Sequence, residues 1–95
     1  MRPVKASVLE RLREHDMIGQ QEFLDRYSSG RPPRVHYLQY GGRLYPLKAI
    51  WAAAHRTPVH TRDFNTAEAR RGLEELGFDE FIELLLPHPV SKNSN

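Results

Sequence analysis

Six arginine and lysine residues fall within residues 31–62, and this basic segment holds no aspartate or glutamate. All twelve acidic residues lie outside it, so the formal net charge of +2 conceals a segregation of charge along the chain. A positive field over part of a surface attracts polyanions, and nucleic acid is the usual partner. The alternative is that these side chains only keep a hairpin soluble. The six residues are Arg31, Arg34, Arg43, Lys48, Arg56 and Arg62.

The side chains of this segment predict two kinds of contact with DNA. Arginine and lysine neutralise phosphates, whereas tyrosine and histidine approach bases or sugars. Arg43 follows a predicted turn and is the best candidate for reading a base, because arginine donates two hydrogen bonds to guanine. Lys48 is predicted to contact a phosphate, with packing of its alkyl chain past Trp51 as the alternative. The predicted nucleic-acid-binding residues are Arg34, His36, Tyr40, Arg43, Tyr45, Lys48, His55, Arg56, Arg62 and Asn65.

The sequence predicts no catalytic, metal or cofactor site. With no cysteine, the chain has neither a disulfide framework nor a thiolate metal ligand. His55 and His60 lie five residues apart without a third ligand nearby, which does not match a zinc site. His36, His55, Asp63 and Asn65 are residue types found in metal-dependent nucleases, but their spacing does not match a ββα-metal motif, so a small nuclease or other enzyme is an alternative that we do not favour.

Length and composition predict one small domain. A chain of 95 residues with 39% hydrophobic content supports a modest core but not a deep cleft with a second lobe. We expect the domain to span residues 1–86 and residues 87–95 to form a flexible tail. No apolar run reaches the length of a membrane span and the N-terminus lacks a signal peptide, which predicts a cytoplasmic protein without a membrane partner.

Apolar spacing predicts two helices before the basic segment. Residues 3–16 place apolar side chains on one face, and Gly19 is expected to end this helix with a left-handed cap. A second helix is predicted over residues 20–27, followed by a loop over residues 28–33.

A β-hairpin is predicted next. Residues 34–40 are rich in aromatic and β-branched side chains, and Gly41-Gly42 supplies the positive φ angles of a two-residue turn before a second strand over residues 43–45. Residues 78–86 fit either a strand or a helical turn; we favour a third strand, because a lone hairpin is marginally stable.

Two further helices complete the predicted α+β fold. The first covers residues 46–55, with Pro46 at its first position and Trp51 in the core. Its alanines either form an exposed stripe that approaches DNA closely or pack tightly on a neighbouring helix. The second helix covers residues 66–76 and is expected to begin with a capping box formed by Asn65 and Glu68.

Three runs, taken in order, resemble the N-terminal head domain of McrA-type (ScoMcrA-like) HNH restriction endonucleases. They are IGQQEFLDRY at residues 18–27, YLQYGGRLYPLKAI at residues 37–50 and LEELGF at residues 73–78, joined by His55 and the Asp63-Phe64 pair. The resemblance covers residues 8–80. It implies a multidomain nuclease family that cuts DNA carrying modified bases or a sulfur-modified backbone.

Two departures limit what the resemblance implies. The family usually follows the Asp-Phe pair with a Ser-Gly-Gly loop, whereas this chain has Asn65-Thr66-Ala67, so a function that needs glycines in that loop is not carried over. The HNH module is absent from these 95 residues. The resemblance therefore implies DNA recognition without cleavage, by a stand-alone reader or an excised head domain.

The predicted function is that of a non-catalytic module that binds double-stranded DNA. It would recognise modified DNA, such as DNA with methylated cytosine, as the reader of a restriction or antiviral defence system, alongside a nuclease domain or subunit. One alternative is a regulatory adaptor whose basic segment docks an acidic protein. Another is a binder of RNA or single-stranded nucleic acid, because exposed tyrosines stack on unpaired bases.

Overall fold

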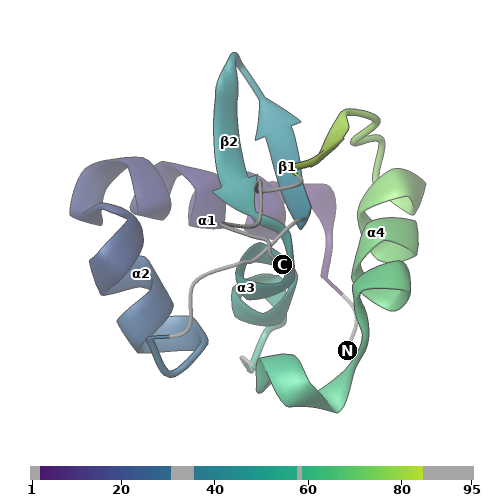
Figure 1. Cartoon of the computed structure of the whole chain (residues 1–95). Helices are drawn as coiled ribbons and strands as arrows, with labels where there is room; N and C mark the ends of the chain where they lie inside the picture. Colours follow the sequence, from purple (N-terminus) through teal and green to yellow (C-terminus); the bar gives the residue numbers. More distant parts are fainter. Residues whose placement is uncertain (1–2, 31–35, 58, 85–95) are drawn as a thin grey trace, which may run out of the picture.

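The computed structural model describes residues 3–30, 36–57 and 59–84. The order of elements confirms the predicted α+β fold with two N-terminal helices, a hairpin, two further helices and a third strand (Figure 1). The tail predicted for residues 87–95 lies outside the described residues. The elements are α1 (Lys5–Ile18), α2 (Gln20–Tyr27), β1 (His36–Tyr40), β2 (Arg43–Pro46), α3 (Leu47–Ala54), the short 3-10 helix η1 (Thr61–Asp63), α4 (Thr66–Glu75) and β3 (Phe81–Glu83).

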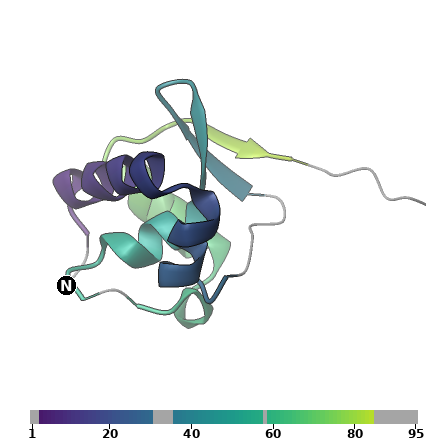
Figure 2. The same cartoon turned by 90° about the vertical axis from the view of Figure 1, so that its left-hand side faces the viewer.

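The three strands form one antiparallel sheet in the order β2-β1-β3. Gly41 and Gly42 have φ angles of 58° and 81°, as the predicted two-residue turn requires. The third strand pairs with β1 and places Ile82 opposite Tyr37, which confirms the strand expected in this region. The hairpin projects beyond the helices in both views (Figures 1 and 2).

Helix α3 runs through the centre of the fold and packs against α1, α2 and α4 (Figure 1). Its alanines are all buried, so the prediction of tight packing is confirmed and the alternative of an exposed alanine stripe is wrong. Small side chains let the neighbouring helices approach α3 closely. Pro46 precedes the helix as its N-cap, in contrast to the predicted first helical position, because its backbone still belongs to β2.

At the helix ends, the predicted cap of α1 is wrong and the predicted capping box of α4 is confirmed. Gly19 has a φ of 88° but an extended ψ of 161°, so the predicted left-handed cap is wrong; this single residue turns the chain from α1 into α2. The capping box of α4 is confirmed, since Asn65 and Glu68 exchange hydrogen bonds of 3.0 and 2.8 Å. At the other end, Gly77 with a φ of 99° allows the Phe78 N–H to bond the Leu73 carbonyl at 3.0 Å.

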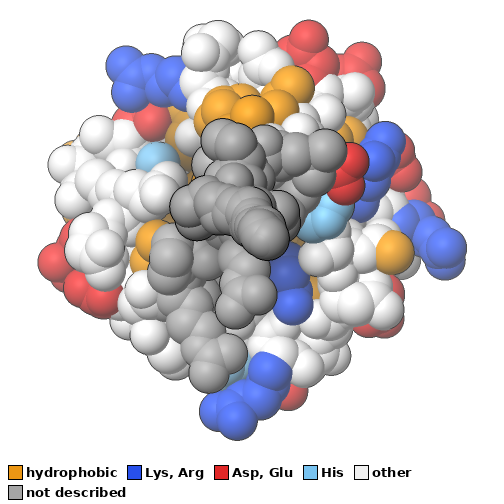
Figure 3. Space-filling view, viewed as in Figure 1, with side chains coloured by type: hydrophobic (Ala, Val, Ile, Leu, Met, Phe, Trp, Pro, Cys, Tyr) orange, Lys and Arg blue, Asp and Glu red, His pale blue; other side chains and the backbone are white. Residues whose placement is uncertain are grey.

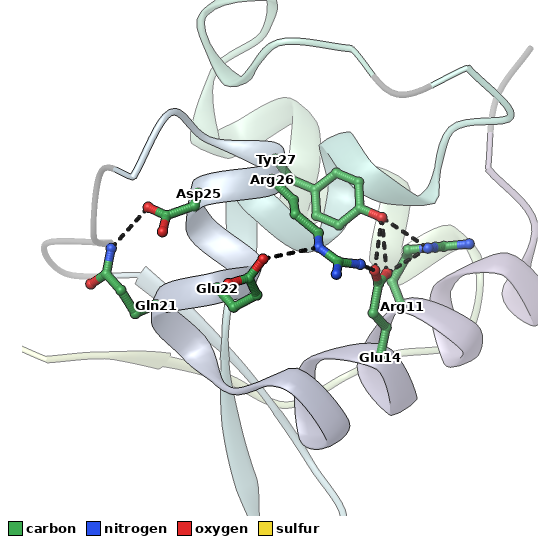
Figure 4. Close-up of polar contacts among 7 residues, drawn as sticks. All are labelled: Arg11, Glu14, Gln21, Glu22, Asp25, Arg26 and Tyr27. Carbon is green, nitrogen blue, oxygen red and sulfur yellow. Dashed lines mark hydrogen bonds and ion pairs between the residues drawn. The ribbon is translucent and has the colours of Figure 1, made fainter.

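Glu14 joins α1 to α2 through a polar network (Figure 4). Its carboxylate accepts hydrogen bonds from the Arg26 guanidinium at 2.8 Å and the Tyr27 hydroxyl at 2.9 Å, and it also pairs with Arg11. Burial acts to raise the pKa of Glu14, but the hydrogen bonds from Tyr27 and Arg11 outweigh it and lower that pKa. These charges outside the basic segment therefore hold the two helices together.

Among the described residues, no helix is long and apolar enough to cross a bilayer.

Candidate nucleic-acid interface

The strand β2 presents two predicted site residues that Asp16 of α1 holds in place. The Tyr45 hydroxyl donates to the two carboxylate oxygens of Asp16 at 2.9 and 3.0 Å, and an Arg43 guanidinium nitrogen lies 3.3 Å from one of them. Tyr45 is only 3% exposed, whereas the Arg43 side chain is 68% exposed. Arg43 is thus exposed to solvent while paired with Asp16, and the buried Tyr45 fixes the position of the same carboxylate.

Burial also changes the acid-base behaviour of Tyr45. It raises the pKa of the phenol to about 12, and the hydrogen bond to the Asp16 carboxylate adds to this effect. The hydroxyl therefore remains a donor to Asp16 throughout the physiological pH range.

The central strand β1 carries two more of the predicted residues. Tyr40 lies beside the turn, where its ring makes an edge contact with Phe78 at 5.5 Å and the residue remains 42% exposed. His36 is exposed at the other end of the strand, 3.8 Å from Glu83 of β3. Arg34 lies outside the described residues.

Phe64 organises a second group of predicted residues, which we name the Phe64 group. Lys48 places its Nζ 5.5 Å from the centre of the Phe64 ring, and His55 stacks on the same ring at 6.5 Å. The Lys48 side chain therefore lies on Phe64, where a cation over an aromatic face is stabilised. Asn65 follows Phe64 in the chain, but its side chain caps α4.

Two arginines lie on the connection between α3 and α4. Both Arg56 and Arg62 are exposed, and Arg62 belongs to η1, whose first turn is fixed by the Arg62 N–H donating to His60 Nδ1 at 3.1 Å. This connection lies at the opposite end of the molecule from the hairpin turn (Figures 1 and 2).

Among the described residues, the contacts of the predicted side chains therefore define two groups. Tyr40, Arg43 and Tyr45 belong to the hairpin, whereas Lys48 and His55 gather on Phe64. Figure 3 shows Lys and Arg side chains at separate places around one face, several of them next to acidic side chains.

Two important residues were missing from the predicted set. Asp16 is separated by 27 and 29 residues from its partners Arg43 and Tyr45, so no local spacing reveals it. Phe64 was visible in the Asp-Phe pair, but the motif does not show that Lys48 and His55 pack on it.

An open cleft of about 470 Å³ lies beside the Phe64 group, between α3, η1 and α4. Its lining mixes aromatic rings with carboxylates. Among the described residues, no three histidine or acidic side chains converge closely enough to hold a metal ion. The lining residues are Trp51, His55, Val59, Asp63, Phe64, Glu68, Arg71 and Glu75.

This fold and these two groups define a small α+β domain with an exposed arginine on a hairpin and a half-buried lysine on an aromatic ring. Residues 4–80 match the family described as the ScoMcrA-like, N-terminal head domain, and the chain belongs to that family. This confirms the resemblance identified from the sequence motifs.

A solved structure agrees with this assignment. The chain is similar to the Type IV phosphorothioation-dependent restriction endonuclease ScoMcrA, with a TM-score of 0.67 and 27% sequence identity. The similarity covers 93% of this chain but 14% of that enzyme, so it is confined to a small part of the larger protein. Comparison with curated proteins found no match.

Proposed function

We propose that this chain is a non-catalytic DNA-binding module that reads modified DNA for a restriction or defence system. The observation that carries the proposal is membership of the head-domain family, together with similarity to a phosphorothioation-dependent restriction endonuclease. Because the similarity covers 14% of that enzyme, cleavage is assigned to parts outside this chain. The modification is either in the base, as in methylated cytosine, or in the backbone, as in that relative.

The hairpin supplies the proposed reading element. Its turn consists of two glycines, which add no side-chain bulk where the strands would approach a groove. Arg43 directly follows this turn and remains largely exposed although Asp16 braces it. A positioned guanidinium loses less conformational entropy on binding than a free one. We therefore assign base reading to Arg43 and place Tyr40 beside a sugar or base.

Phosphate contacts are assigned to three other cations, of which Arg56 and Arg62 are exposed and Lys48 is half-buried. No ion pair joins Lys48 of the Phe64 group or Arg62 of η1 to a carboxylate within the described part of the chain. Each phosphate contact steepens the dependence of affinity on salt, by about 0.9 in the slope of log K against log salt for duplex DNA. Arg56 extends this part of the surface.

The test is a binding titration with matched duplexes at two salt concentrations. The duplexes are unmodified, cytosine-methylated, hydroxymethylated or phosphorothioated, with single-stranded DNA and RNA beside them. We expect one modified duplex to bind most tightly. No binding to any probe at low salt would refute the proposal, and preference for a single strand would favour the single-strand alternative.

Two variants distinguish base reading by Arg43 from the general attraction of cations to phosphates. Arg43→Ala is expected to weaken binding to the preferred duplex about tenfold or more, and to weaken binding to unmodified DNA less. Lys48→Ala should weaken binding to all duplexes similarly and reduce the salt slope by about 0.9. Arg13→Ala removes an exposed charge from α1 and serves as the control. A uniform loss in Arg43→Ala would contradict its reading role.

A further inference from the structure

The cleft between α3, η1 and α4 has walls that suit a flat ligand group. The rings of Trp51 and His55 meet edge to face at 5.2 Å, and His55 stacks on Phe64 at 6.5 Å with 24° between the ring planes. All three rings line the cleft, whose volume of about 470 Å³ is that of a ligand site.

Hydrogen bonding fixes the polar character of these walls. His55 Nδ1 lies 2.8 Å from the Trp51 carbonyl oxygen, and since a carbonyl only accepts, Nδ1 carries the proton. In this tautomer the Nε2 of His55 is an acceptor. The nearby carboxylates are also acceptors, so a ligand rich in donors matches this site.

Two of these carboxylates are held in place by the backbone. Asp63 Oδ2 accepts from the His60 N–H at 3.3 Å, and Glu68 Oε1 accepts from the Asn65 N–H at 3.0 Å. In each carboxylate the second oxygen makes no further hydrogen bond within the described part of the chain. The second oxygen of each carboxylate is therefore held beside the aromatic rings and can accept a hydrogen bond from a ligand.

The charge of the lining selects a cation. Asp63 and Glu68 contribute two carboxylates held by the backbone, and the lining also holds the opposite charges of Arg71 and Glu75. The two positioned carboxylates disfavour an anion inside the cleft, whereas a guanidinium is planar, stacks on aromatic faces and donates to carboxylates through two parallel hydrogen bonds. We propose that the cleft binds an arginine side chain presented by a protein segment.

The similarity to a larger enzyme explains why a protein segment is the occupant. The matched restriction endonuclease extends far beyond the part that this chain resembles, so in that relative a head of this kind accompanies much additional protein. An arginine from a neighbouring domain or subunit would anchor this head without using the hairpin. The site is thus independent of the proposed DNA contacts of Arg43.

Fluorescence gives a direct test, because Trp51 is the single tryptophan of the chain and lines the cleft. The intact chain is titrated with the blocked peptide Gly-Gly-Arg-Gly-Gly, and with the same peptide carrying citrulline or lysine at the centre. We expect a saturable change in Trp51 emission with the arginine peptide. Binding should weaken about three- to tenfold with citrulline, which keeps the shape and removes the charge.

Variants of two lining residues test whether the arginine peptide binds in the cleft, and a variant on α1 serves as the control. Glu68→Gln removes a lining charge but keeps the capping box, because glutamine also serves at this position. It is expected to weaken arginine-peptide binding about three- to tenfold. Asp63→Asn provides a second lining variant, and Glu10→Gln, an exposed site on α1, should leave binding unchanged.

Each other result overturns the proposal. Equal affinity for the arginine and citrulline peptides would show that charge is not recognised. An unchanged affinity in both Glu68→Gln and Asp63→Asn would place binding elsewhere. A saturable Trp51 response to free cytidine or guanosine, with none to the arginine peptide, would identify a nucleobase pocket instead. DNA titrations of Glu68→Gln report separately on the proposed function.

Discussion

Replacing Gly72 with alanine should destabilise the domain, although the same change usually stabilises a helix. Gly72 lies in α4 directly against the indole of Trp51 in α3. A Cβ atom at this position would lie 2.7 Å from Cζ3 of that indole, and nearer still to Cη2 and Cζ2. Carbon atoms at van der Waals contact are about 3.5–4.0 Å apart, so one of the two helices must move.

Two opposing effects determine how much the free energy of unfolding decreases in Gly72→Ala. Alanine in a helix interior is favoured over glycine by about 0.8–1.0 kcal/mol. Overpacking a filled core costs about 1–3 kcal/mol, and three overlapping ring atoms place this variant at the upper end. Trp51 is 6% exposed and packs edge to face with His55, so a shift of its ring would disrupt existing packing. We expect a net loss of about 2 kcal/mol, or roughly 8–16 °C in Tm for a domain of this size.

Urea denaturation followed by far-ultraviolet circular dichroism measures this loss. Trp51→Leu removes the obstructing ring and has its own cost, but in the Trp51→Leu, Gly72→Ala double variant the alanine should no longer destabilise. The expected coupling between the two sites is therefore about 2–3 kcal/mol, the overpacking cost of the alanine alone. A Gly72→Ala protein as stable as the parent, or equal alanine effects with and without Trp51, would refute the packing argument.

Two further variants test local features of the fold. Asn65→Ala removes the side-chain acceptor that caps α4 and should cost about 1 kcal/mol in urea denaturation, whereas Asn65→Asp should cost little; equal losses would exclude the cap as the cause. The ring of His15 packs edge-on against Phe23 and Tyr45, and its burial lowers the pKa below the ordinary 6.5. The unfolded chain then binds the proton more readily, so the free energy of unfolding should decrease as pH falls below about 6.5 and level off once the folded pKa is passed. Urea titrations between pH 7.5 and 5 should show this decrease in the parent and not in His15→Gln, and identical pH profiles would contradict it.

Local signals in the sequence predicted most of the fold. The Gly41-Gly42 turn and the Asn65 cap each depend on a few adjacent residues, and both were confirmed. Gly19 departs from its predicted cap because it must also begin α2, a requirement that the first helix alone does not reveal. The alanines of α3 remained ambiguous for a similar reason, since composition does not show whether a small side chain faces solvent or another helix.

The candidate site was harder to predict because the residues that contact one another there are distant in sequence. The acid-free composition of residues 31–62 suggested one positive surface, but folding brings Asp16 to Arg43 and Glu83 to His36. Charge segregation along a chain therefore does not ensure charge segregation in space. No spacing within the basic segment contains this information, since both acids come from elements outside it.

This redistribution of charge bears on the DNA contact that we propose for the domain. If many unpaired cations lined one surface, attraction to phosphates would dominate and binding would depend steeply on salt. Here Arg43 already has Asp16 as a partner, and an ion pair must be loosened or shared before that guanidinium reaches DNA. Exchanging one partner for another yields little net affinity but penalises any duplex that fails to replace the lost contact. Asp16 thus favours selectivity over strength, so Asp16→Asn should increase affinity for unmodified DNA more than for the preferred duplex.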